Sequence, residues 1–189
     1  DSITAYWMSE FRLDGFRFDF TKGFTNKTGD GWAYDASRIA ILKRMATEMW
    51  KHNPNAYVIF EHLTDNSEEK ELSNFGIMLW GNMNGKYGEA AKGSNDNGNS
   101  DLNWGSYKSR SWTYPTLVTY MESHDEEREM YRCLKEGLSM GNYNVQDTAT
   151  ALKRAGLIAT FLFTIPGPKM IWQFGERGYD YSINYDADG

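Results

Sequence analysis

Hydrophobic and polar positions along the chain follow two alternating periods. Five runs of four to six residues are apolar and rich in aromatic or β-branched side chains, a pattern typical of buried strands. The strands predicted from these runs cover residues 15–20, 57–60, 76–80, 117–121 and 169–174.

Between these runs, apolar residues recur every three or four positions, which predicts amphipathic helices. We expect one helix to end near residue 11 and a second to begin at Asp35 or Ser37 and to stop before Pro54. A short helix is predicted over 67–72 and the longest over 145–163. The apolar side predicted for this last helix consists of Ala149, Leu152, Gly156, Ala159 and Phe163.

Strands that alternate with helices predict parallel pairing with right-handed crossovers. Two folds share this pattern, the open doubly wound sheet and the (β/α)8 barrel. No glycine-rich phosphate loop follows the first strand, which disfavours the dinucleotide-binding form of the open sheet. A barrel needs eight strands. Because only five are predicted and the sequence starts within a helical pattern, we expect the chain to be part of something larger.

Composition narrows the classes of partner. The 189 residues carry a formal net charge of −6 without a basic stripe, so nucleic acid is not an expected partner. Cys133 is the only cysteine, which excludes an internal disulfide and a thiolate metal cluster. The longest apolar stretch, 155–165, is too short for a membrane span. Aromatic residues make up 15% of the chain, and they either fill a core or line a groove for sugar rings.

Two charged residues interrupt the first apolar run. Arg17 and Asp19 alternate with Phe16, Phe18 and Phe20, so the period of two places them on the same side of a strand. A buried carboxylate needs a compensating charge, which an adjacent guanidinium supplies. We expect Arg17 to hold Asp19 ionised, as a nucleophile requires. The alternative is a purely structural ion pair.

Other acidic residues follow two of the remaining runs. Glu61 comes directly after the second run, and His124 and Asp125 come shortly after the fourth. Barrel enzymes keep their catalytic groups at such carboxyl ends of strands. A Glu with apolar neighbours can stay protonated and act as a general acid. The alternatives are a Glu that turns into solvent and a His-Asp pair that caps a loop. Carboxylates at three strand tips nevertheless fit glycoside hydrolysis, which uses two carboxyls across the scissile bond.

Four blocks of sequence resemble the α-amylase superfamily. Gly15–Asp19 resembles its strand-four signature, Glu61 its strand-five acid, and Glu122–Asp125 its strand-seven signature, in which Asn commonly precedes His-Asp. Residues 166–176 resemble the segment that runs through strand eight. The surrounding sequence is most similar to bacterial α-amylases of the Bacteroides type. The resemblance implies an α/β fold in which residues 1–189 form strands four to eight of a (β/α)8 TIM barrel, with strands one to three absent.

The resemblance also implies a function and a set of roles. The expected reaction is hydrolysis of α-1,4-glucosidic bonds in starch or related α-glucans, with retention and a covalent glycosyl-enzyme intermediate. Asp19 would be the nucleophile, Glu61 the acid/base and Asp125 a third carboxylate that orients sugar hydroxyls. Arg17 would hold Asp19, and His124 would donate a hydrogen bond to the sugar at the cleavage site.

Two features depart from the family pattern. A Lys-His pair often follows the nucleophile strand, but here Gly23 takes the place of the His. Lys22 remains and is expected to bind a sugar beyond the cleavage point. The strand-three signature, with its Asp and His, is missing. Calcium is expected only in a full-length parent, because the usual side-chain ligands come from parts outside this chain.

The substrate-binding candidates also include Trp80 and Asn82, which follow the third run, although packing is the simpler interpretation of the tryptophan. Two other functions share the same sequence features. An α-glucan transglycosylase, such as a branching enzyme or a glucanotransferase, would use the same carboxylates. A non-catalytic glucan-binding protein would not need three acids.

Two expectations concern the chain as a whole. Export to the periplasm, cell surface or medium is expected, because starch is too large to enter a cell intact. Alone, the fragment is expected to be weak or inactive and to self-associate or require the missing half of the barrel, because open sheet edges invite pairing.

Overall fold

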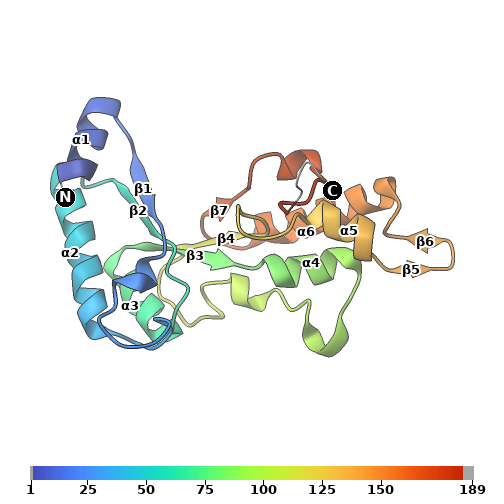
Figure 1. Cartoon of the computed structure of the whole chain (residues 1–189), viewed down its shortest axis with the longest axis horizontal. Coiled ribbons are helices and arrows are strands. Elements are labelled where there is room, and N and C mark those ends of the chain that lie inside the picture. The colour runs from blue at the N-terminus through green and yellow to red at the C-terminus, as the bar shows by residue number, and fades with distance from the viewer. Residues whose placement is uncertain (1, 185–189) are drawn as a thin grey trace. The chain divides into compact units, whose positions relative to one another are not determined.

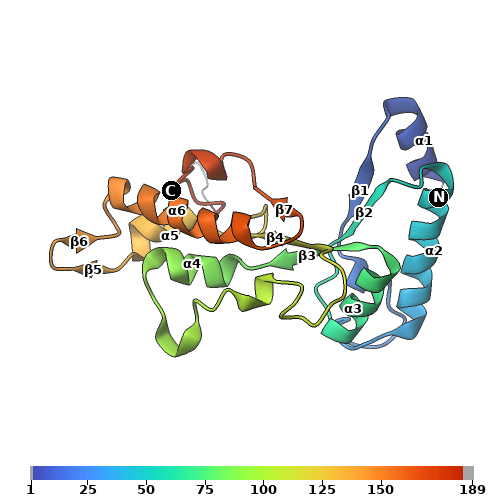
Figure 2. The ribbon, with the colours of Figure 1, turned by 180° about the vertical axis from the view of Figure 1, so that it is seen from behind.

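The computed structural model describes residues 2–184. The chain divides into two compact units, which can be followed in Figure 1 and, from behind, in Figure 2. The first unit consists of the chain up to Trp80 together with Arg110–Val118. The second consists of Gly81–Ser109 together with the chain from Thr119 onward.

Five strands form a sheet in the order β1-β2-β3-β4-β7. β1 pairs in parallel with β2, β2 with β3, and β4 with β7. The strands are β1 Gly15–Phe18, β2 Tyr57–Phe60, β3 Met78–Asn82, β4 Leu117–Tyr120 and β7 Lys169–Met170. Because parallel strands alternate with helices along the chain, the prediction of an α/β fold, a partial (β/α)8 barrel, is confirmed.

The first unit contains three α-helices, α1 Ser2–Phe11, α2 Ala36–His52 and α3 Asn66–Phe75, and the 3-10 turn η1 Thr21–Phe24. α2 contacts both other α-helices. The side chain of Asp35 accepts hydrogen bonds from the N–H groups of Ser37 and Arg38, so it begins α2 as the sequence predicts. The buried hydrophobic side of α2 is formed by Ile39, Leu42, Ala46 and Met49.

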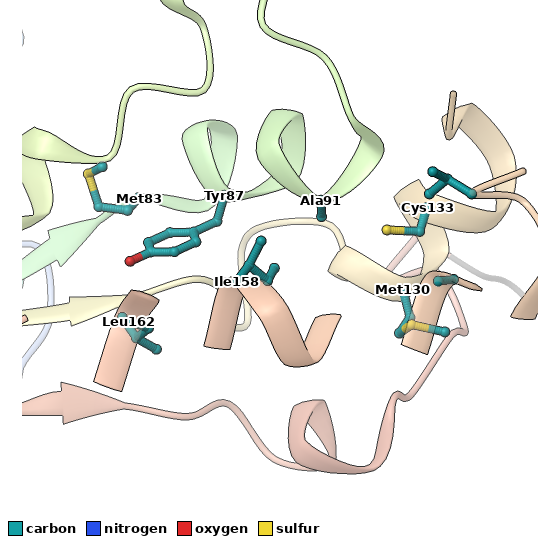
Figure 3. Close-up of a cluster of buried hydrophobic side chains, with 9 residues drawn as sticks. Met83, Tyr87, Ala91, Met130, Cys133, Ile158 and Leu162 are labelled. Carbon is teal, nitrogen blue, oxygen red and sulfur yellow. The ribbon is translucent and has the colours of Figure 1, made fainter. Parts of the chain in front are cut away.

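The second unit is built around three helices, α4 Asn84–Lys92, α5 Glu129–Glu136 and α6 Thr148–Thr164. It also contains the short hairpin β5 Ser139–Met140 and β6 Tyr143–Asn144, and the 3-10 turns η2 Asp96–Gly98, η3 Asn103–Gly105 and η4 Gly175–Arg177. Tyr87 of α4 points toward Ile158 and Leu162 of α6 within the core (Figure 3). The buried cluster consists of Met83, Tyr87, Ala91, Met130, Cys133, Val145, Ala151, Ile158 and Leu162.

The side of α6 predicted from the sequence is not the side that packs into this core. Ala151, Ile158 and Leu162 are buried, whereas Leu152 and Phe163 are 46% and 56% exposed. α6 is apolar around most of its circumference, so helical spacing alone does not select one face. Several strand bounds also differ from the prediction: β1 ends at Phe18 instead of 20, β3 begins and ends two residues later, β4 ends at Tyr120 instead of 121, and β7 ends at Met170 instead of 174.

The helices α4 and α5 were not predicted. α4 contains Gly85 and Gly88, which lower helix propensity, and the start of α5 lies in a run of acidic residues. None of the helices within residues 2–184 has the length and hydrophobicity needed to cross a membrane.

Candidate active site

Arg17 joins two acidic residues at the tips of β1 and β2. Its Nη1 lies 2.6 Å from Oδ1 of Asp19, and its Nη2 lies 2.7 Å from Oε2 of Glu61. Arg17 and Asp19 point to one side of β1, as the period of two predicts. In the parallel register Phe18 is the partner of Phe60, so the next two residues, Asp19 and Glu61, come side by side. The side chain of Glu61 is only 12% exposed, whereas that of Asp19 is 72% exposed, so the expectation that Asp19 is a buried carboxylate is wrong for this chain.

The backbone that follows β1 turns so that it also binds Glu61. Phe20 adopts the left-handed conformation, with φ 44° and ψ 46°, which costs a residue other than glycine about 1–2 kcal/mol. In this conformation the N–H of Phe20 lies 3.1 Å from Oε2 of Glu61. The N–H of Thr21 then donates to the carbonyl oxygen of Glu61 at 2.9 Å. These contacts hold the strained turn in place beside the acidic pair.

The carboxyl group of Glu61 does not have only apolar neighbours, as the sequence predicts, but also two polar ones. Apolar residues precede it along the chain, but Oε2 accepts hydrogen bonds from Arg17 and from the backbone of Phe20. The sequence order of β2 alone does not show this cross-strand neighbour. Both contacts use Oε2 of Glu61 as the acceptor and involve no contact to Oε1.

Two other predicted residues lie near this pair in the first unit. The guanidinium carbon of Arg17 lies 4.1 Å from the ring centroid of Trp80, which is 6% exposed. Trp80 thus packs against Arg17, in accordance with the simpler interpretation of this ring. Nζ of Lys22 lies 3.6 Å from the ring centroid of Trp32, an exposed side chain that the sequence reasoning did not select.

The remaining predicted residues belong to the second unit. His124 and Asp125 lie in the loop after β4, where Nε2 of His124 is 3.3 Å from Oδ1 of Asp125. Both side chains are exposed, and the His124 ring centroid lies 5.8 Å from that of Trp172. Asn82, at the end of β3, donates a hydrogen bond to Glu126. Asn82 therefore already has a partner within its own unit.

Glu122, which lies two residues before His124, has structural contacts of its own. Its Oε1 accepts from the N–H of Glu129 at 2.8 Å, and its Oε2 lies 3.2 Å from Nη1 of Arg128. Arg128 Nη1 also donates to the carbonyl oxygen of Gln173 at 3.0 Å. The side chains of Glu122 and Arg128 are buried. Glu122 thus holds the first turn of α5.

Sequence reasoning missed a buried polar cluster in the first unit. Arg38, His62 and Glu68 have fully buried side chains and are joined by hydrogen bonds. Glu68 was visible in the sequence only as an acidic residue in the first turn of a predicted helix, where a negative charge is common. His62 directly follows Glu61, and this adjacency was the only signal that could have singled it out.

At the tips of β1 and β2 the two neighbouring acidic side chains share one cation, the guanidinium of Arg17. In the part of the chain that the structure describes, no three His, Cys, Asp or Glu side chains are arranged to hold a metal ion. Calcium in a full-length parent stays a prediction.

Solved structures with a similar fold exist, although sequence comparisons find no match. No protein-family model matches the sequence, and no curated protein matches it either. Among solved structures, apo pullulanase from Klebsiella pneumoniae is similar with a TM-score of 0.66 and 13% identity, over 93% of this chain and 24% of that chain. A Nostoc punctiforme debranching enzyme, from a crystal soaked with acarbose, is similar with a TM-score of 0.56 and 18% identity, over 97% and 37%.

At these identities the likeness shows a shared fold. This chain spans about a quarter of the first of these proteins and somewhat more than a third of the second.

Proposed function

We propose that the chain supplies the catalytic residues of a retaining glycoside hydrolase that cleaves α-1,4-glucosidic bonds in starch or related α-glucans. The observation that carries this proposal is the bridge from one guanidinium, that of Arg17, to both Asp19 and Glu61. Retaining glycosidases need two carboxyl groups only about 5–5.5 Å apart. A single cation that contacts both carboxylates suits such a short separation.

The two carboxylates would take different parts in the reaction. Asp19, whose side chain is largely exposed, would attack the anomeric carbon and form the glycosyl-enzyme ester. Protonated Glu61 would give its proton to the departing glycosidic oxygen. Glu61, then a carboxylate, would take a proton from water as the water oxygen attacks the anomeric carbon and releases Asp19. The resting hydrogen bonds of Glu61, which require an acceptor, suit this second half of the cycle.

Other residues would bind the sugar. Asp125 and His124 present exposed polar groups in the second unit, which suits contact with sugar hydroxyls. Lys22 would contact a sugar beyond the cleavage point. The α-amylase family resemblance supports these roles. The two similar structures are named pullulanase and debranching enzyme, which supports an α-glucan as the class of substrate. Those names make pullulan and a branched glucan substrates to assay beside starch.

The chain is further proposed to be the carboxyl-terminal half of its catalytic barrel. Within residues 2–184 it contributes five strands to one sheet, whereas a barrel has eight. On this proposal the chain is weak or inactive alone and self-associates or requires the other half. The parent is exported and, where it binds calcium, completes that site with residues outside this chain.

The test is the release of reducing sugar from soluble starch, by the 189-residue chain and by a longer protein that completes the barrel around it. Asp19→Asn, Glu61→Gln and Asp125→Asn are each expected to lower kcat by at least 100-fold, because each removes a charge or proton needed in the transition state. Asp180→Asn and Glu10→Gln are matched controls, because both residues are exposed and neither is among the proposed site residues.

Full activity in any of the three site variants would remove that residue from the mechanism. Product analysis on maltooligosaccharides separates hydrolysis from transfer, because products longer than the substrate indicate a transglycosylase. Binding of glucan without any bond cleavage by the longer protein would favour the non-catalytic alternative.

A further inference from the structure

A buried hydrogen-bond chain lies directly behind the tips of β1 and β2. Thr21 follows Asp19 by two residues, and His62 follows Glu61 by one. Oγ1 of Thr21 lies 2.9 Å from Nδ1 of His62, and Nε2 of His62 lies 2.8 Å from Oε1 of Glu68. Thr21, His62 and Glu68 are all fully buried. These hydrogen bonds thus connect Thr21 and His62, the residues that closely follow the two proposed catalytic carboxylates.

Glu68, at the end of this series of hydrogen bonds, is held by a buried ion pair with Arg38. Nε of Arg38 lies 2.7 Å from Oε1 of Glu68, and Nη2 lies 2.8 Å from Oε2. The N–H of Asp35 donates to Oε2 of Glu68 at 2.7 Å. Arg38 also donates through Nη1 to the carbonyl oxygen of Lys22 at 2.7 Å. The backbone directly after Thr21 is therefore anchored to the same buried group of side chains that binds its hydroxyl.

The hydrogen-bond partners of Glu68 and His62 define which of their atoms carry protons. Burial alone would raise the pKa of Glu68, but hydrogen bonds from His62 and Arg38 lower it to about 2, so Glu68 is a carboxylate and an acceptor. Nε2 of His62 must then carry the proton that is donated to Glu68. Nδ1 of the neutral ring is consequently an acceptor, and Thr21 donates its hydroxyl proton to it.

Two acceptors lie within reach of the Thr21 hydroxyl, and this assignment indicates which of them receives its proton. The hydroxyl also lies 3.1 Å from the carbonyl oxygen of Glu61, but it has a single proton and can donate to one acceptor at a time. The carbonyl oxygen of Glu61 already accepts from the backbone N–H of Thr21 at 2.9 Å. The side-chain proton is thus available to His62.

We propose that His62 is a positioning residue that acts through Thr21 to set the spacing and orientation of Asp19 and Glu61. The turn at Phe20 is strained and needs contacts on both sides to persist. Thr21 provides them, by its backbone to Glu61 and by its side chain to His62. His62 itself is fully buried and does not contact substrate. This inference rests on the proposed function for its effect on rate, but the geometry it describes can be tested separately.

The geometric test uses the 189-residue chain. Long-range proton–nitrogen correlation spectra at pH 7 are expected to show His62 as the neutral tautomer with the proton on Nε2. His52→Gln and His124→Gln assign the other two histidine signals. Crystal structures of wild type and Thr21→Val are expected to show a changed distance between the Asp19 and Glu61 carboxyls, because the variant keeps the shape of Thr21 but removes its proton donor. Thr113→Val, at an exposed position, is the matched control.

The kinetic test uses the longer protein that completes the barrel. Thr21→Val is expected to lower kcat on starch by about 10- to 100-fold, the loss typical of a small misplacement of reacting groups, with KM nearly unchanged. Thr21→Ser restores the hydroxyl and is expected to recover kcat to within about threefold. A His62 proton on Nδ1, or an unchanged carboxyl separation in Thr21→Val, would overturn the proposal. If wild type does not cleave starch, the proposed function fails, while the spectra and crystal structures still decide the role of His62.

Discussion

Removal of the Glu68 carboxylate is the perturbation that most directly probes how the first unit is held together. Glu68 accepts two hydrogen bonds from Arg38, one from His62 and one from the backbone of Asp35, all between 2.7 and 2.8 Å. The side chains of Arg38 and Glu68 have no exposed surface. Glu68→Ala would therefore leave a buried guanidinium without its counter-charge.

The size of the effect follows from this burial. Removal of one partner of a buried ion pair costs about 3–5 kcal/mol of unfolding free energy, because the remaining charge is desolvated and uncompensated. We expect Glu68→Ala to lower the free energy of unfolding by about that amount. The double variant Arg38→Met with Glu68→Leu is expected to lose less than Glu68→Ala alone, because it leaves no buried charge unpaired.

Urea denaturation followed by circular dichroism measures these free energies by linear extrapolation. The chain provides a matched control, since Glu71 lies on the same helix and pairs with Lys43 of α2 at 2.6 Å, but its side chain is 40% exposed. Glu71→Ala is expected to cost about 1 kcal/mol or less. A loss below about 1 kcal/mol for Glu68→Ala, or an equal loss for both variants, would refute the reasoning.

Two further predictions concern titratable groups. Burial lowers the pKa of His62, against the opposing effect of Glu68 and with smaller effects of Arg38 and Lys22, so its contribution to the free energy of unfolding is present above about pH 6.5 and is lost as the pH falls. Urea titrations between pH 8 and 5 should show this decline in wild type and a smaller one in His62→Gln; equal slopes would contradict it. Burial, together with Glu129, raises the pKa of Cys133 to about 11, so a thiol reagent at pH 8 should modify this cysteine only in denaturant. Rapid modification of the native chain would show that Cys133 is not buried.

Local patterns explain which parts of the fold could be predicted from the sequence. The strand at Tyr57–Phe60 and the cap at Asp35 depend on neighbours within a few residues, and the structure confirms both. The pairing of Arg17 with Asp19 follows from the period of two and is also confirmed. The buried side of α6 depends on which other helices pack against it, and the sequence does not contain that information locally.

The buried polar cluster could not be predicted from local sequence patterns either, because its contacts join residues that are far apart in the sequence. His62 and Thr21 are 41 residues apart, and Arg38 and Glu68 are 30 apart, so only the tertiary fold brings them together. The contact between Arg17 and Glu61 likewise crosses 44 residues. Met130 and Cys133 are spaced as on one side of a helix, a signal that could have revealed α5. The catalytic roles of Asp19, Glu61 and Asp125 stay predictions.

On the proposed mechanism, Asp19 becomes covalently linked to the sugar during catalysis. The most direct measurement is peptide mass mapping of the longer protein after incubation with a fluorinated α-glucosyl fluoride, which slows hydrolysis of the glycosyl-enzyme ester. We expect one added fluorosugar on Asp19 and none in Asp19→Asn. A fluorosugar ester on a different carboxylate, with Asp19 unmodified, would contradict it.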